Sequence, residues 1–440
     1  MFKLKLHWQI LIALILAIAA GLLTGRETGV FGISFFAMYD FVGELFLNAL
    51  RLLIVPLIMS SIICGIAGIG SGGALGRLGG MTLFYYLATG LVATFTGLVI
   101  VNLISPGIVD GEPAREILGL SAAKGAAAAE EIGGRGAADL TQVFLDMIPP
   151  NIVEAAANGQ LLGLITFSLV FGYFMTRIEA PFSEHLWQLW QGIFQVMMRI
   201  TDLVMKFAPL GVFALVAEVV ASIDPSEMAE LAQTVGLFFV SVMLGLIFHA
   251  VVTLPALLFF VGRVSPWRHY RAMSTALLTA FSTASSSATL PVTMECLEKN
   301  AGVSNRISSF VLPLGATVNM NGTALYECVA AIFIAQAYGL ELTFATQFTV
   351  VIIALLTSVG VAGIPAASLV AIAIIMQAIG LPLEAIGIIL AVDRILDMFR
   401  TALNIFGDTC VAVVIARHEG EQGILQAEPA ASALPREPAR

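Results

Sequence analysis

The sequence carries little charge for its length. Asp, Glu, Lys and Arg make up 12% of the 440 residues, whereas hydrophobic residues make up 58%; an average soluble domain carries about 25% charge. This shortage excludes an ordinary soluble protein, and we expect no nucleic-acid partner. Because the apolar residues form long runs, the sequence predicts an all-α polytopic membrane protein rather than a barrel.

Cysteine is also scarce. The four cysteines, Cys64, Cys296, Cys328 and Cys410, are scattered within or beside apolar segments. None shows metal-ligand spacing, and a disulfide framework is not expected. The net charge of -9 says little about partners, because many of the acids fall in one loop and in the C-terminal tail.

Eight apolar runs predict eight transmembrane helices, at about 8–24, 38–69, 80–105, 150–178, 185–221, 230–262, 306–337 and 383–416. Several exceed the roughly 20 residues of a straight crossing, so tilted or broken helices are expected. The first run is interpreted as a membrane helix rather than a signal peptide, because no clear small-residue cleavage site follows it.

Two further apolar segments, about 268–298 and 342–381, are interrupted by small residues and a proline. The interruptions read Ser285-Ser-Ser-Ala-Thr-Leu-Pro291 and Ser358-Val-Gly-Val-Ala-Gly-Ile-Pro365. Each segment can be a simple crossing, but unwound backbone at membrane depth is typical of re-entrant hairpins that line a transport site. We therefore predict two re-entrant helical hairpins.

The distribution of basic residues predicts the orientation. With hairpins that return to their own side, one set of helix ends holds most of the Lys and Arg: Lys3, Lys5, Arg77, Arg177, Arg263, Arg268, Arg271, Lys299, Arg306 and Arg417. This side is predicted to be cytoplasmic, with both termini on it. The first hairpin then opens from the inside and the second from the outside. Residues 106–146 form an extracellular loop and 418–440 a disordered tail.

One face of the last apolar run is strongly polar. Its members are Asp393, Asp397, Arg400, Thr401, Asn404 and Asp408, which fall within about 100° of a helical circumference. A structural polar network is the simpler alternative, but such a face in a membrane usually lines a substrate or ion path. Arg400 can clamp a carboxylate in two-point geometry, Asp397 can accept an ammonium, and Asp408 suits a hard monovalent cation.

Two other motifs point in the same direction. In Asn319-Met-Asn-Gly-Thr323, Asn321 and Gly322 are expected to break the helix and free carbonyls that suit Na+; a plain kink is the alternative. The triple serine Ser285–Ser287 has no neighbouring base for nucleophilic catalysis. Hydroxyls and free N–H groups at a hairpin tip instead suit an anion. The chain is not expected to be an enzyme.

With these motifs, the chain resembles the glutamate/aspartate transporter family of dicarboxylate/amino acid:cation symporters, as a prokaryotic member. The resemblance implies an elevator fold in a homotrimer, surrounded by membrane lipid. It places the scaffold at 1–79 and 147–221, the transport domain at 80–105 and 222–417, the extracellular loop at 106–146 and the tail at 418–440.

The resemblance also implies a substrate site. Arg400, supported by Thr323, would hold the side-chain carboxylate, and Asp397 the α-ammonium. Asn404 and the first hairpin would hold the α-carboxylate, while the tip of the second hairpin closes the site as an extracellular gate. The full set is Arg400, Asp397, Thr401, Asn404, Thr323, Ser285, Ser286, Ser287, Ala362, Gly363, Ile364 and Pro365.

Three sodium sites are implied as well. One would use Asp408 with Gly315, Asn319 and Asn404; a second would use carbonyls near Thr317 and Ser358; a third would use Tyr86, Thr89, Asn319 and Asn321. Many family members carry Asp at the position of Asn321 and a hydroxyl at that of Gly90. Losing a carboxylate weakens a buried cation site, so we expect fewer coupled ions.

The expected function is uptake of L-aspartate or L-glutamate, driven by Na+ across a bacterial inner membrane. Asp408 favours Na+ over H+, because proton-coupled relatives tend to lose this acid. A proton-coupled carrier or a C4-dicarboxylate symporter is the nearest alternative. An anion channel, of a different class, would not need the Asp397–Arg400 pair.

Overall fold

The computed structural model describes residues 6–68, 73–118, 120, 145, 148–157, 161–222, 228–358 and 368–425. These residues are mostly helical. Two small antiparallel hairpins, β1 (Gly29–Val30) with β2 (Ile33–Ser34) and β3 (Ile108–Val109) with β4 (Glu112–Pro113), follow the first and third long helices. The predicted all-α class is therefore confirmed at the level of secondary structure.

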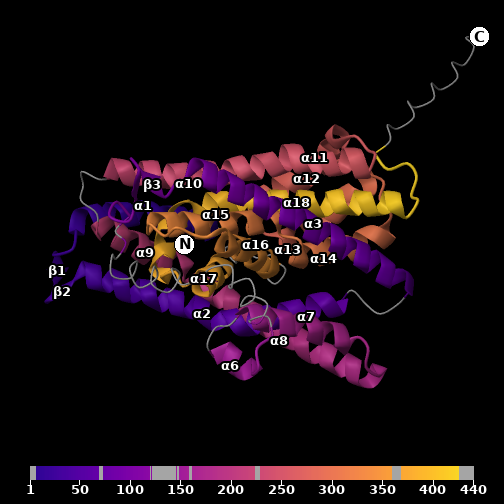
Figure 1. The fold of residues 1–440 in the computed structure, drawn as a ribbon, viewed down its shortest axis with the longest axis horizontal. Helices are drawn as coiled ribbons and strands as arrows, with labels where there is room; N and C mark the ends of the chain where they lie inside the picture. Colours follow the sequence, from indigo (N-terminus) through magenta and orange to yellow (C-terminus); the bar gives the residue numbers. More distant parts are fainter. Residues whose placement is uncertain are drawn as a thin grey trace, which may run out of the picture.

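The helices fall into two packed sets. The first contains α1 (Leu6–Thr24), α2 (Phe35–Gly68), α6 (Ile152–Ala157), α7 (Leu161–Met175), α8 (Ala180–Lys206) and α9 (Ala208–Ser222). Helix α1 packs along α9, and α2 packs against α7, α8 and α9. Figure 1 shows α2, α6, α7 and α8 along one long side of the molecule.

The second set surrounds α15 and α18. It contains α3 (Gly73–Ile104), α10 (Met228–Phe248), η2 (His249–Thr253), α11 (Leu254–Ala256), η3 (Leu257–Val261), α12 (Pro266–Thr283), α13 (Ser286–Glu295), η4 (Cys296–Asn300), α14 (Asn305–Val318), α15 (Asn321–Ala337), α16 (Phe344–Ser358), α17 (Ser368–Ala378), η5 (Leu383–Ala385) and α18 (Ile386–His418). Helix α18 packs against α3, α10, α12, α14 and α15 (Figure 1). The core of the protein therefore lies around α15 and α18.

Among the described residues, four helical segments are long and apolar enough to cross a membrane: Arg77–Ile104, Ala229–Val261, Asn305–Ala337 and Val392–His418. They correspond to the predicted runs at 80–105, 230–262, 306–337 and 383–416. The other four runs appear as α1, α2, α6–α7 and α8–α9. That these also cross, which gives the total of eight, stays a prediction.

Both interrupted segments form pairs of packed helices, α12 with α13 and α16 with α17. In the first pair the chain turns at Ala284, whose φ of 48° is left-handed, and Ser285 caps α13 by accepting from Ala288 N at 3.3 Å. At the open end, Asn300 Nδ2 donates to Ala272 O at 3.0 Å. The pair is therefore a closed hairpin, as predicted. The tip of the second hairpin, 359–367, lies outside the described residues.

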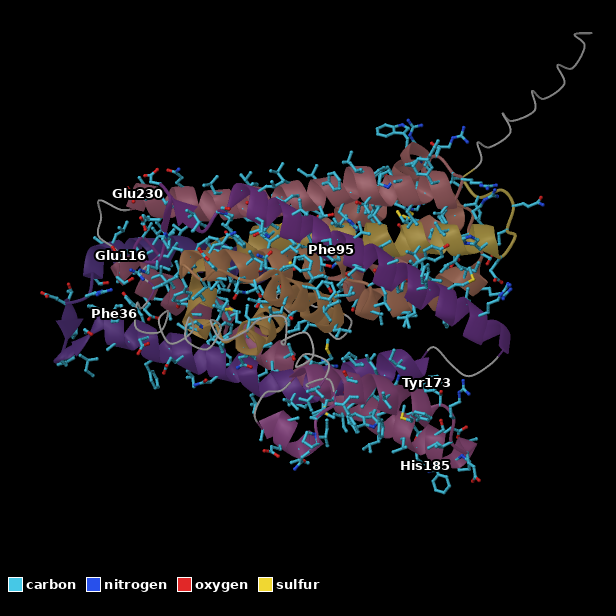
Figure 2. All side chains as sticks on the ribbon, in the orientation of Figure 1. Phe36, Phe95, Glu116, Tyr173, His185 and Glu230 are labelled. Carbon is cyan, nitrogen blue, oxygen red and sulfur yellow. The ribbon has the colours of Figure 1, made fainter. Side chains whose placement is uncertain are left out.

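The chain alternates between two ends of the molecule. Phe36, Glu116 and Glu230 gather at one end in Figure 2, whereas Tyr173 and His185 lie toward the other. Arg77 and Arg306, predicted to share a side, both reach Glu419, at 2.5 and 3.4 Å. The two residues therefore lie at one end; which end faces the cytoplasm stays a prediction.

Helices α9 and α2 pack closely at Gly211. A Cβ at this α9 position would lie 2.2 Å from Cγ of Phe46 on α2. Gly211→Ala should therefore destabilise the protein by about 1–3 kcal/mol through overpacking, measured as the melting temperature in detergent. The matched control is Gly236→Ala on α10, where a Cβ meets nothing within 4 Å. This change should be neutral or stabilising, because Ala favours helix more than Gly. Equal melting temperatures for the two variants would contradict the packing.

Candidate functional site

The polar face of α18 is buried, as its periodicity predicted. The side chains of this face are between 0% and 7% exposed: Asp393, Asp397, Arg400, Thr401, Asn404 and Asp408. They face α14, α15 and α17, which supply the partners described below. A charged face inside a protein core must find neutralising partners there.

Arg400 is fully buried and lies at the centre of the charged group. Its Nη2 donates to Asp393 Oδ1 at 2.9 Å and to Asp397 Oδ1 at 3.1 Å. Its Nη1 donates to Ser368 Oγ on α17 at 2.9 Å. The guanidinium also stacks on the ring of Tyr326 from α15, 3.8 Å from the ring centroid, which stabilises a desolvated cation. Elements far apart in sequence therefore hold this one charge.

The remaining donor of Arg400 has no partner among the described residues. Its Nε is buried without a hydrogen bond, a rare state for a buried N–H that calls for an explanation. Asp397 is shared, because Arg394 Nη1 donates to its Oδ2 at 3.2 Å. The group formed by Asp393, Arg394, Asp397 and Arg400 thus holds two positive and two negative charges, and the Nε atoms of both arginines are buried without a hydrogen bond among the described residues.

The break between α14 and α15 opens toward α18. It lies at Asn319 and Met320, whose backbone angles are not helical, whereas the sequence placed it at Asn321 and Gly322. Those two residues instead begin α15. Gly322 allows contact with α18, since a Cβ there would lie 3.0 Å from Arg400 O. The glycine is therefore required for close approach rather than for the break.

Asn404 connects α18 to the start of α15. Its Oδ1 accepts from Gly322 N at 2.8 Å, and its Nδ2 donates to Thr323 Oγ1 at 3.1 Å. The predicted residues Arg400, Asp397, Asn404 and Thr323 thus lie in one connected cluster. Thr401 is buried on the same helix face.

A second polar cluster surrounds Asp408. Asn319 Nδ2 donates to Asp408 Oδ1 at 2.8 Å, and a Cβ at Gly315 would lie 2.5 Å from Asp408 Oδ1 and 2.6 Å from Tyr86 Oη. The Oδ1 of Asn319 is buried without a hydrogen bond among the described residues. None of the ion pairs found in the described part of the chain involves Asp408. A lone buried carboxylate beside free oxygens is suited to a small cation.

Among the remaining predicted ion ligands, two side chains donate their hydrogen bonds within their own helices. Asn321 lies against α3, since a Cβ at Gly90 would be 3.3 Å from its Oδ1. Thr89 donates to Tyr85 O of its own helix at 2.8 Å, and Ser358 to Leu355 O at 2.7 Å. The side chain of Thr317 lies outside the described residues. Among those described, no three His, Cys, Asp or Glu side chains form a metal cluster, so any cation here would be bound mainly by amide and carbonyl oxygens.

The first hairpin contacts α18 next to Arg400. Phe281, four residues before the triple serine, packs edge-on against Phe399 with ring centroids 5.0 Å apart. Ser286 is buried, Ser285 half-buried and Ser287 exposed. The predicted gate residues Ala362, Gly363, Ile364 and Pro365 lie outside the described residues.

Sequence reasoning gave no substrate-site role to three residues that hold Arg400. These are Asp393, Tyr326 and Ser368. Asp393 was assigned to the polar face, and Tyr326 follows Thr323 by one helical turn, so periodicity could have indicated both. Ser368 carries no such signal, because only the fold brings α17 beside α18.

Comparisons with known proteins identify similar sequences over nearly the whole chain. A model of the sodium:dicarboxylate symporter family matches residues 6–418. The chain is 34% identical to the proton/glutamate-aspartate symporter of Escherichia coli (strain K12) over 417 residues, 95% of this chain and 93% of that protein. It is 32% identical to the proton/sodium-glutamate symport protein of Geobacillus stearothermophilus, covering 96% of each. It is also 34% identical to excitatory amino acid transporter 1 of Ambystoma tigrinum, over 93% of this chain and 83% of that protein. These relatives are transporters, not enzymes.

The ion pairs of the buried Arg400 should contribute to the stability of the protein. Asp393→Ala removes one of two carboxylates from a fully buried guanidinium, which should cost about 3–5 kcal/mol, measured by thermal unfolding in detergent. The control is Glu295→Ala, which breaks an ion pair with Lys299 whose side chains are 61% and 72% exposed. That change should leave the melting temperature unchanged. An equal effect in both variants would contradict the burial of the Arg400 charge.

Proposed function

Because this chain belongs to the sodium:dicarboxylate symporter family, we propose that it is a secondary active symporter that takes up L-aspartate or L-glutamate together with Na+. The substrate class is supported by its relatives, two of which are named for glutamate. The choice of Na+ rests on Asp408.

Arg400 carries the proposal. Its unpartnered buried Nε lies beside Nη2 on one edge of the guanidinium, an edge that binds carboxylates in two-point geometry. A substrate carboxylate arriving there would compete with Asp393 and Asp397 for Nη2. Asp397 would then lose one of its two arginine partners, and its carboxylate would accept the α-ammonium. Asn404 and Thr323 lie close enough through Gly322 to contact the rest of the same small molecule.

Charge balance supports coupling to a cation. The four charges around Arg400 sum to zero, so an acidic amino acid adds one net negative charge to a buried site. Asp408 adds another, with an amide as its hydrogen-bond partner. Since uncompensated buried charge is costly, binding of Na+ at Asp408, Asn319 and Gly315 would stabilise the loaded site. Asn321 brings no charge, so a third sodium near Tyr86 and Thr89 is not favoured.

The division into two packed sets supports the proposed elevator. The first set would form the scaffold, residues 1–79 and 147–221. The second would form the transport domain, 80–105 and 222–417, with the charge group and the Asp408 cluster wholly inside it. The sets touch where α9 meets α18 and where α2 meets α14 and α17. Both termini would face the cytoplasm of a bacterial inner membrane.

A polar stripe on α8 supports the proposed homotrimer. Its members are exposed in a single copy of the chain and recur at intervals of three, four or seven residues: Glu184, Gln188, Gln191, Gln195, Arg199 and Lys206. Polar side chains facing lipid are costly. Contact with other copies would remove the stripe from lipid; the number three follows from the family.

Proton coupling is the second candidate, and Glu327 favours it. This fully buried carboxylate accepts from Thr357 Oγ1 at 3.0 Å through Oε2, while its Oε1 has no partner among the described residues. A carboxyl in this setting can carry a proton in its neutral form. The E. coli relative is named as a proton symporter.

Uptake of labelled L-aspartate into proteoliposomes separates the two candidates. With an inward Na+ gradient and no proton gradient, we expect uptake that Asp408→Asn abolishes, because the variant loses the cation's charged ligand. With an inward H+ gradient and no Na+, we expect none. Uptake on H+ alone would reject sodium coupling and direct attention to Glu327. Protein-free liposomes measure the background.

Replacing the arginine tests the substrate assignment. Arg400→Cys should lower acidic amino acid uptake by about 30-fold or more, because a buried charged contact to carboxylate is worth about 2–5 kcal/mol. The same variant should accept a small neutral amino acid better than the natural protein does. Arg271→Cys, at an exposed position of α12, serves as the control. Normal acidic uptake by Arg400→Cys would refute the clamp.

A further inference from the structure

Residues 419–425 fold back across the end of the molecule after α18 ends at His418. The prediction of a disordered tail is therefore wrong for residues 418–425, and the rest of that tail, 426–440, lies outside the described residues. We name residues 419–425 the strap. It turns through left-handed Gly420 and Gly423, and Ile424 and Leu425 at its end are 3% and 6% exposed. A segment that buries two large apolar side chains is a packed part of the fold.

The strap binds both sides of the open end of the α12–α13 hairpin. Leu425 N donates to Ala301 O, just after η4, at 2.9 Å. Arg268, near the start of α12, donates from Nη1 to Leu425 O at 3.2 Å. Gly302 also faces the strap, since a Cβ there would lie 3.5 Å from Gly423 O. One residue thus bridges the two arms of the hairpin.

The same segment reaches α14 and α3. Glu421 Oε2 accepts from Ser304 N, at the start of α14, at 3.0 Å, and its other oxygen accepts from the Ser304 hydroxyl. Glu419 accepts from Arg77 of α3 at 2.5 Å and from Arg306 of α14 at 3.4 Å. The strap therefore joins the ends of α3, the hairpin and α14.

We propose that the strap is a conformational clasp that keeps the open end of the α12–α13 hairpin fixed to α14. The residues of the strap contribute unequally to the stability of this clasp. Arg77 and Arg306 are 68% and 62% exposed, so their pairs with Glu419 add little and are screened by salt. Glu421 and Leu425 hold the clasp, through charge-assisted bonds to a backbone N–H and through apolar burial.

Hydrogen exchange of the full-length protein tests the clasp without relying on transport. In Glu421→Gln, amides of 266–272 and 301–308 should exchange about 10-fold faster, the change expected for a lost charge-assisted bond. Leu425→Ala should produce the same pattern. Glu295→Gln, which alters an exposed pair on the same hairpin, is the matched control and should not change exchange.

Amides of α15 serve as an internal reference. If they exchange as in the natural protein while the hairpin and the start of α14 exchange faster, the clasp is supported. Unchanged exchange in both strap variants would show that the segment is only a packed helix end and would overturn the proposal. Equal acceleration in α15 would show general destabilisation and would overturn it too.

Discussion

A guanidinium in the interior of a membrane protein must be neutralised within hydrogen-bonding distance, because burying a lone charge costs several kcal/mol even after relaxation. Arg400 meets this requirement with carboxylates from its own helix, a hydroxyl from α17 and an aromatic face from α15. These contacts fix the relative positions of three helices. In the proposed function, a substrate carboxylate would bind to the same charged group that holds these helices together.

The Asp408 cluster depends on a second constraint, the interruption of α14–α15. An unbroken helix would pair its carbonyls internally and leave none for an ion. Because Asn319 and Met320 leave the helical conformation, the Asn319 amide can reach Asp408. The cluster and the Arg400 group lie about two helical turns apart along α18, with Asn404 between them in sequence on the same helix face. In the proposed mechanism, this short distance couples ion and substrate through charge balance.

The two packed sets differ in where their polar side chains lie. The second set encloses its charges, as Arg400 and Asp408 show. The first set leaves a polar stripe exposed on α8 in a single copy of the chain. The strap adds a connection of another kind, in which a segment after the last helix ties together elements that begin more than 100 residues earlier.

The helical class, the polar face of α18 and both hairpins follow from the sequence, because helical periodicity and breaks by small residues are local properties. The family was also recognisable from its motifs. The position of the α14–α15 break was predicted two residues too late, since Gly322 looks like a helix breaker but serves close packing. The roles of Ser368 and the strap were decided by tertiary structure alone, because they come from contacts between distant segments, which no local pattern encodes.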